Sequence, residues 1–338
     1  MQKLLAALLL STSLAHAGNA TIDAALAKEL AAKTIEQVEA RALLPARQAD
    51  YDAAKQRVQG FLAGDAPAFD RKQLYRVIND MLDTIDSDGH TMLWSREVTQ
   101  HAERSVPPLD VIPSQVRVID TQHGTALVIN PPAISTSDAK AMREYIAAMQ
   151  RGIAEAKGLE RSCALVVDLS GQTGGNAWPP LLVLEPLFTA QNSARFVDRH
   201  NNRQQIANPA TIRNFKKRVG KVPPNALERF RGLPYGVVYA NATASAGEML
   251  AIALQGEPGR SRSFGAPTYG MTTGNLPVAM PDNALLLLTT ERYAFGDQPV
   301  IRGKLAPDVA APAQDAVRQA AEWAAAQSPA CKARVAAR

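Results

Sequence analysis

The chain has 338 residues, of which 46% are hydrophobic, 20% charged and 5% aromatic, and its formal net charge is +5. This balance excludes a largely disordered chain, and no apolar stretch reaches the roughly 18–20 residues of a membrane span. Lys216–Arg218 is the densest cationic run and has no stacking aromatics within it, which favours a solvated surface over a nucleic-acid groove. At roughly 100–200 residues per domain, the length predicts two packed units, or one large unit with an appendage.

Residues 1–17 have the layout of a secretory signal peptide. Lys3 precedes an apolar run, and the segment ends in an Ala-x-Ala pattern at residues 15–17. A buried N-terminal helix or a short anchor is the alternative interpretation. No Cys follows the expected cleavage site, so the sequence does not indicate a lipid anchor. We therefore expect an exported protein, periplasmic or secreted, whose mature chain begins near Gly18.

Amphipathic helices are predicted next, because apolar residues recur at spacings of three and four. Proline and glycine breaks separate these segments. The apolar segments lie at 22–42, 51–61 and 74–82. Since each apolar stripe must be buried against something, residues 18–105 predict a small helical bundle, or cap.

From about residue 106, strands alternate with helices. The expected strands are 116–119 and 125–129, which form a hairpin around Gly124, followed by 164–169, 235–240 and 285–290. The expected helices are 137–156, 245–255 and 313–326. This alternation is typical of an α/β layer with a substantially parallel sheet. We assign residues 106–330 to one such unit.

Cys163 and Cys331 allow one disulfide bridge in an oxidising compartment, which would tie the C-terminal segment to the core. Cys163 also opens an apolar run, so a small buried thiol is an equal alternative. The five histidines lie far apart and no Cys/His cluster has the spacing of zinc ligands. We therefore expect neither a metal nor another cofactor.

A glycine-rich turn follows the strand predicted at 164–169. It contains Gly171, Gly174 and Gly175, and glycines let backbone N–H groups approach a ligand closely. No Gly-Lys-Ser/Thr follows, which excludes a Walker loop. A purely structural turn is the alternative interpretation.

A second turn, at residues 241–249, places Ser245 among small residues where a strand leads into a helix. Free amides and the helix dipole at such a position favour a developing negative charge. The alternative is that Thr243 or Ser245 simply caps the helix, with Glu248 completing a capping box. No Gly-x-Ser-x-Gly nucleophile elbow is present.

The motifs are more specific in combination than singly. In chain order they are Asp168-Leu-Ser-Gly171 with Gly174-Gly175, Thr243-Ala-Ser-Ala-Gly-Glu248, Gly265-Ala-Pro-Thr-Tyr-Gly270 and Ala306-Pro-Asp-Val309. This set resembles the C-terminal-processing and tricorn-type serine peptidase family. The resemblance implies a crotonase-like α/β core, shared with Clp-type proteases. It further implies that Ser245 is the nucleophile and that Gly174 or Gly175, with Ala246, forms the oxyanion hole.

The same resemblance directs the search for a general base to the helical bundle. Processing proteases of the family carry a Lys after their Thr-Phe-Gly motif, but Met271 stands there and cannot accept a proton. The tricorn-type branch takes a His from its N-terminal cap, and Asp88-Gly89-His90 resembles that segment. An imidazole with an ordinary pKa of about 6.5 accepts a serine proton near neutral pH. The alternative for His90 is a surface residue or a helix C-cap.

The sequence leaves open which group orients the His90 ring. The tricorn-type branch uses a Glu shortly before the Pro-Asp motif, where this chain has no acid. Glu291 and Asp297 are the nearest candidates, and a backbone carbonyl or a hydroxyl would leave a Ser–His dyad. Asp308 of the Pro-Asp motif is expected to cap a turn.

The interval between His90 and Ser245 is filled by predicted core elements, which leaves no room for a PDZ domain. This layout resembles peptidases of the nisin-resistance-protein type. We therefore expect an exported serine-type peptidase that cleaves a peptide or protein substrate. The alternative is a catalytically inactive module on the same fold that binds an extended peptide or an apolar ligand, which the missing Lys and the missing late Glu favour.

Overall fold

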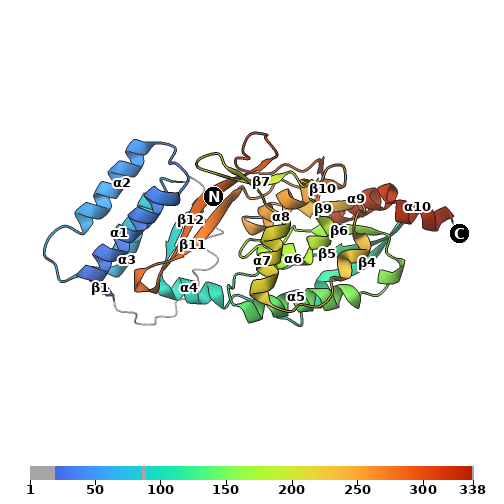
Figure 1. Ribbon diagram of the computed structural model, residues 1–338, viewed down its shortest axis with the longest axis horizontal. Coiled ribbons are helices and arrows are strands. Elements are labelled where there is room, and N and C mark those ends of the chain that lie inside the picture. The colour runs from blue at the N-terminus through green and yellow to red at the C-terminus, as the bar shows by residue number, and fades with distance from the viewer. Residues whose placement is uncertain (1–19, 86–88, 337–338) are drawn as a thin grey trace.

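The computed structural model describes residues 20–85 and 89–336. The predicted signal peptide lies outside the described residues, as does Asp88 of the Asp-Gly-His segment. Figure 1 shows α1, α2 and α3 at one end of the molecule and the C-terminal helices α9 and α10 at the other, with the β11–β12 ribbon between them.

The N-terminal part forms the helices expected there. Its elements are β1 (Thr21–Asp23), α1 (Ala24–Arg41), α2 (Gln48–Phe61), β2 (Ala68–Asp70), α3 (Arg71–Leu82), β3 (Met92–Trp94) and α4 (Arg96–Glu103). The side chains of Asp23 and Asp70 accept hydrogen bonds from backbone N–H groups in the first turns of α1 and α3. These caps explain why both helices begin directly after a short strand.

This helical unit shares its hydrophobic core with a hairpin from the far end of the chain. The hairpin consists of β11 (Thr273–Ala279) and β12 (Leu285–Phe295). Leu286 and Leu288 of β12 lie in one cluster with Leu74 and Ile78 of α3. At the hairpin tip, the Arg71 guanidinium donates to both carboxylate oxygens of Asp282, at 2.6 and 2.5 Å. The helices are therefore anchored to the ribbon.

The main sheet has the strand order β13-β10-β9-β6-β5-β4. Its strands are β4 (Val116–Thr121), β5 (Gly124–Ile129), β6 (Ala164–Asp168), β9 (Tyr235–Tyr239), β10 (Ser261–Gly265) and β13 (Val309–Ala310). All neighbouring pairs are parallel except β4–β5, which forms the predicted hairpin. The predicted α/β class with an N-terminal helical bundle is confirmed.

Helices cover both faces of this sheet. Alternate strand residues face opposite ways, so that Leu165 and Val167 pack in one cluster while Val166 packs in the other. The first face carries α5 (Ala139–Ala154), α6 (Trp178–Val183), α7 (Pro209–Val219) and α8 (Ala246–Gln255). The second face carries α9 (Ala313–Gln327).

A second sheet has the order β11-β12-β7-β8 and includes β7 (Ala194–Asp198) and β8 (Arg203–Gln205). β3 pairs with β12 in this sheet, which ties the segment after residue 89 to the ribbon. β12 extends to Phe295, well past the strand predicted at 285–290.

Cys163 and Cys331 form a disulfide, so the bridged alternative is the one that the structure adopts. The bond joins α10 (Pro329–Ala336) to the residue before β6. The Ser328 hydroxyl also donates to the Cys163 carbonyl, at 2.5 Å. Among the helices of the described residues, none has the length and apolar character that a membrane span needs.

Candidate active site

Ser245 sits in a sharp turn between β9 and α8, with a backbone φ of 51° and ψ of −112°. A residue other than glycine in this region typically carries about 1–3 kcal/mol of strain, which clusters at functional sites. The neighbouring residues hold the turn: the Ala244 N–H donates to the Gln172 carbonyl at 3.1 Å, and the Thr243 hydroxyl donates to the Leu169 carbonyl at 2.8 Å. The turn thus exposes a serine without a Gly-x-Ser-x-Gly motif.

The buried Glu248 carboxylate supports this turn from inside. It accepts hydrogen bonds from the Ser245 N–H (2.9 Å), the Thr268 hydroxyl (2.5 Å) and the Gly270 N–H (2.9 Å). Burial raises the pKa of Glu248, and these hydrogen bonds oppose that shift. The Gly265–Gly270 motif is therefore joined to the serine turn through one carboxylate.

His90 comes from the segment between α3 and β3 and lies in contact with Ser245. Its Nε2 is 2.9 Å from Ser245 Oγ, although the two residues are 155 positions apart in the chain. The imidazole is buried, with 7% of its surface exposed. The structure therefore brings together the two residues that the sequence singled out as nucleophile and base.

β11 contacts His90 on the side of the ring that faces away from Ser245. Nδ1 of the ring is 2.5 Å from the Thr273 hydroxyl oxygen, and the His90 carbonyl accepts a hydrogen bond from Asn275 Nδ2 at 2.8 Å. Neither Thr273 nor Asn275 was singled out from the sequence. The hydroxyl alternative, and not Glu291 or Asp297, is the one that meets Nδ1 in the described residues.

Glu291 lies on the opposite side of the β11–β12 ribbon from Thr273. It pairs with Gly274, and its Oε2 is 3.2 Å from where a β-carbon on that glycine would stand. Burial and the neighbouring Asp198 raise the pKa of Glu291. Asp297 is exposed in the turn after β12.

Asp308 directly precedes β13. Its carboxylate accepts hydrogen bonds from the Ser263 N–H and hydroxyl, each at 2.8 Å, and so joins this strand to β10.

The glycine-rich turn passes directly beside the serine. Gly174 has φ +125°, and a β-carbon built on it would lie 3.3 Å from Ser245 Cβ. Gly175 is packed against the chain at Ile134 instead, where a β-carbon would stand only 2.4 Å from the carbonyl oxygen. The Ala246 N–H begins α8 and has no hydrogen-bond acceptor in the described part of the chain. The Gly174 N–H donates to Gln172 Oε1 at 3.4 Å, a long contact within the same turn.

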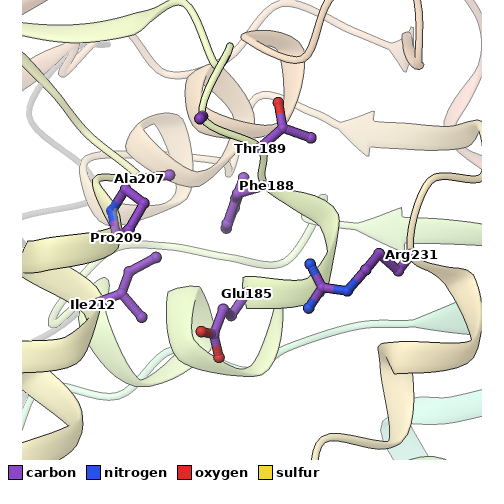
Figure 2. A pocket seen from close by; sticks show the side chains of 8 residues that line it. Glu185, Phe188, Thr189, Ala207, Pro209, Ile212 and Arg231 are labelled. Atoms are coloured by element: carbon purple, nitrogen blue, oxygen red, sulfur yellow. The ribbon is translucent and has the colours of Figure 1, made fainter.

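No group of His, Cys, Asp and Glu residues in the described ranges has a metal-binding arrangement. A surface pocket of about 170 Å³ has neither Ser245 nor His90 in its lining (Figure 2). Its lining residues are Glu185, Phe188, Thr189, Ala190, Ala207, Pro209, Ile212 and Arg231.

Comparison with known proteins agrees with this geometry. The profile of peptidase family S41 matches residues 127–311, which is more than half of the chain. The chain belongs to peptidase family S41. The matched segment includes Ser245 and the glycine-rich turn, while His90 precedes it. The chain therefore has the family and the fold of a serine peptidase, and the predicted resemblance is confirmed.

One curated relative is the nisin-resistance protein of Lactococcus lactis subsp. lactis. It is 25% identical over 171 residues, which are 49% of this chain and 50% of that protein. The chain thus matches about half the length of this relative.

Two solved structures share the fold over most of their lengths. A lipoprotein from Streptococcus agalactiae superposes with a TM-score of 0.69 at 20% identity, covering 89% of this chain and 96% of that one. The photosystem II D1 C-terminal processing protease gives a TM-score of 0.55 at 14% identity, covering 90% and 98%.

Proposed function

We propose that this S41 protein is an exported serine peptidase in which Ser245 and His90 form the catalytic pair. The observation that carries the proposal is the 2.9 Å contact between Ser245 Oγ and His90 Nε2. This distance lies within the reach that a general base needs for proton transfer. The contact joins residues from two separate parts of the chain, which helix capping alone does not require.

The first half of the proposed reaction forms an acyl-enzyme. Ser245 Oγ attacks the carbonyl carbon of the scissile peptide while His90 Nε2 accepts the hydroxyl proton. The tetrahedral intermediate then collapses, His90 returns the proton to the amine nitrogen, and the C–N bond breaks. In the second half, His90 takes a proton from water as the water oxygen attacks the ester carbon. The C–O bond to Ser245 Oγ then breaks, and His90 returns the proton to Oγ, which restores the free enzyme. A base in this position typically contributes about 10²–10⁴-fold.

The proposed oxyanion hole combines the start of α8 with the glycine-rich turn. The Ala246 N–H is free in the described residues, and the helix dipole favours negative charge at this end. Gly174 approaches the Ser245 side chain more closely than Gly175 does, so we assign the second donor to Gly174. Its N–H would exchange the 3.4 Å contact with Gln172 Oε1 for the oxyanion. One such donor is typically worth about 10²–10³-fold in rate.

The inactive binding module is the less well supported alternative. A binding module needs neither a strained serine nor a histidine within hydrogen-bond distance of it. Both features occur together here. Met271 stands where processing proteases have a Lys, and in this proposal His90 serves as the general base instead of that Lys.

Export is supported by the signal-like sequence at residues 1–17 and by the Cys163–Cys331 disulfide, since such bonds persist in oxidising compartments. The structural relative from Streptococcus agalactiae is a lipoprotein, which agrees with a location outside the cytoplasm. We propose a peptide or protein substrate, in keeping with the family.

The proposal is tested by profiling a peptide library by mass spectrometry with wild type and Ser245→Ala. Wild type is expected to produce cleavage products that the folded variant does not. A folded wild-type protein that yields no products, or yields the same products as Ser245→Ala, would overturn the proposal.

A further inference from the structure

Thr273 is a buried residue at the start of β11, with 2% of its surface exposed. Its hydroxyl oxygen lies 2.5 Å from His90 Nδ1, on the side of the ring opposite Ser245. The imidazole is therefore placed between two hydroxyl groups, one on each ring nitrogen.

We propose that Thr273 is a positioning residue that fixes the ring orientation and the tautomer of His90. This inference rests on the proposed serine-peptidase function. In Ser-His-Asp triads, a carboxylate holds the imidazole in its productive tautomer. Here the neutral hydroxyl of Thr273 takes that position against Nδ1.

The chemistry of the two nitrogens explains why a hydroxyl serves this purpose. When Nδ1 carries the proton, it donates to Thr273 Oγ1, and the lone pair of Nε2 faces the Ser245 hydroxyl. In the other tautomer, Nε2 carries a proton and cannot accept one from Ser245. While Thr273 Oγ1 acts as the acceptor at Nδ1, it therefore holds the imidazole in the reactive form.

Thr273 is itself held in place. Its backbone carbonyl accepts a hydrogen bond from the buried Tyr293 hydroxyl at 2.9 Å. Two residues further along β11, Asn275 donates to the His90 carbonyl at 2.8 Å and accepts from the Thr289 hydroxyl at 2.9 Å. β11 therefore contacts both the imidazole ring and the backbone carbonyl of His90.

The β-branched side chain also suits this role, because threonine has few χ1 rotamers and little freedom to turn its hydroxyl away. Valine has nearly the same shape and lacks the hydroxyl. Serine keeps the hydroxyl with a freer side chain. The two substitutions separate the hydrogen bond from the packing.

Thr272 provides a matched control. It is adjacent in sequence, 1% exposed, and its hydroxyl donates to the Gly303 carbonyl at 2.9 Å, away from His90. Thr272→Val therefore removes a buried hydroxyl bond of the same kind without touching the imidazole.

The first test measures kcat and KM, on a peptide that wild type cleaves and Ser245→Ala does not. Thr273→Val is expected to lower kcat by about 10- to 100-fold with KM within twofold, less than the roughly 10⁴-fold of a lost triad carboxylate. Thr273→Ser and Thr272→Val are expected to stay within about fivefold of wild type. Equal losses in Thr273→Val and Thr272→Val, or no loss in either, would overturn the assignment.

The second test reads the tautomer directly and does not depend on turnover. Long-range ¹H–¹⁵N spectra of ¹⁵N-histidine protein, with His90→Ala for assignment, are expected to show Nδ1–H in wild type and a mixed population in Thr273→Val. If Thr273→Val does not fold, wild type and Thr273→Ser decide the matter. A wild-type His90 that carries its proton on Nε2 contradicts the role of Thr273. A protein with the expected tautomer but no cleavage contradicts the proposed function instead.

Discussion

The backbone N–H of Ser245 donates to the carboxylate of Glu248 at 2.9 Å, while the hydroxyl of the same serine lies 2.9 Å from His90 Nε2. The sequence offered a helix cap and a nucleophile as alternative interpretations of Ser245. The structure places a capping hydrogen bond on the serine backbone and leaves its hydroxyl facing the imidazole. The two interpretations are therefore compatible, since the capping box and the contact with the imidazole occur together at this residue.

We predict that Glu248→Ala strongly destabilises the protein and lowers the reactivity of Ser245. The change leaves the Ser245 N–H, the Thr268 hydroxyl and the Gly270 N–H without their acceptor. At about 1–3 kcal/mol for each buried unsatisfied donor, the expected loss is about 3 kcal/mol or more. Urea unfolding measures it. Glu29→Ala, at an exposed position of α1, serves as control and is expected to stay within about 0.5 kcal/mol. An equally small change in Glu248→Ala would contradict the supporting role of this carboxylate.

We predict that Gly174→Ala reduces kcat by about 100- to 1,000-fold, the range for loss of one oxyanion donor. The added methyl group meets Ser245 Cβ at 3.3 Å, and φ +125° is strained for alanine. Gly171→Ala is the matched control in the same turn, since a β-carbon there meets nothing within 4 Å. Steady-state kinetics of both variants check this expectation. Similar activity in the two variants would argue against the placement of the oxyanion hole.

We predict that Glu291→Gln raises the melting temperature near pH 7.5 but not near pH 4. The folded-state pKa of Glu291 lies above its unfolded value, because burial and Asp198 disfavour the charged form. The stability that Glu291 contributes is therefore complete below the unfolded pKa and is lost as the pH rises through the folded pKa. A neutral amide removes this dependence. Since Glu291 lies across the ribbon from Thr273, kcat/KM is expected to stay within about threefold. A large loss of activity would restore Glu291 as a candidate partner of His90.

We predict that Cys163→Ala with Cys331→Ala lowers the free energy of unfolding by about 2–5 kcal/mol, the usual range for a lost disulfide. The bond closes a span of 168 residues, and cross-linking such a long segment restricts the unfolded chain strongly. The disulfide lies in the hydrophobic cluster on the α9 face of the main sheet, whereas α8 packs on the opposite face. Labelling of Ser245 in the folded variant is therefore expected to match wild type. Wild type under reducing conditions provides the same comparison without mutation.

The elements that could be predicted from the sequence are those whose apolar pattern is continuous. β6 and β9 are buried at every position, so their runs of apolar residues identify them. β11 was missed because Gly274 and Pro277 interrupt it and leave no continuous apolar run. The second half of β12 was missed for a similar reason, since Glu291 and Arg292 break the apolar run.

The proposed pair of Ser245 and His90 could be derived from motifs, but the residues that contact His90 from β11 could not. Thr273 and Asn275 lie in a strand that the sequence did not indicate, and their contacts with His90 span more than 180 positions. The division near residue 105 stays a prediction. In space, the β11–β12 hairpin belongs partly to the N-terminal hydrophobic core. Local sequence patterns do not show which residues contact each other across such long separations in the chain.

The central claim is that His90 activates Ser245, and labelling with a fluorophosphonate probe tests it most directly. Mass spectrometry of the labelled protein is expected to locate one adduct on Ser245 in wild type and none in Ser245→Ala. His90→Ala is expected to label at least about 100-fold more slowly, in line with the contribution of a positioned base. Thr272→Val is expected to label at the wild-type rate. A folded wild-type protein that does not label, or a His90→Ala variant that labels as fast as wild type, would contradict the account.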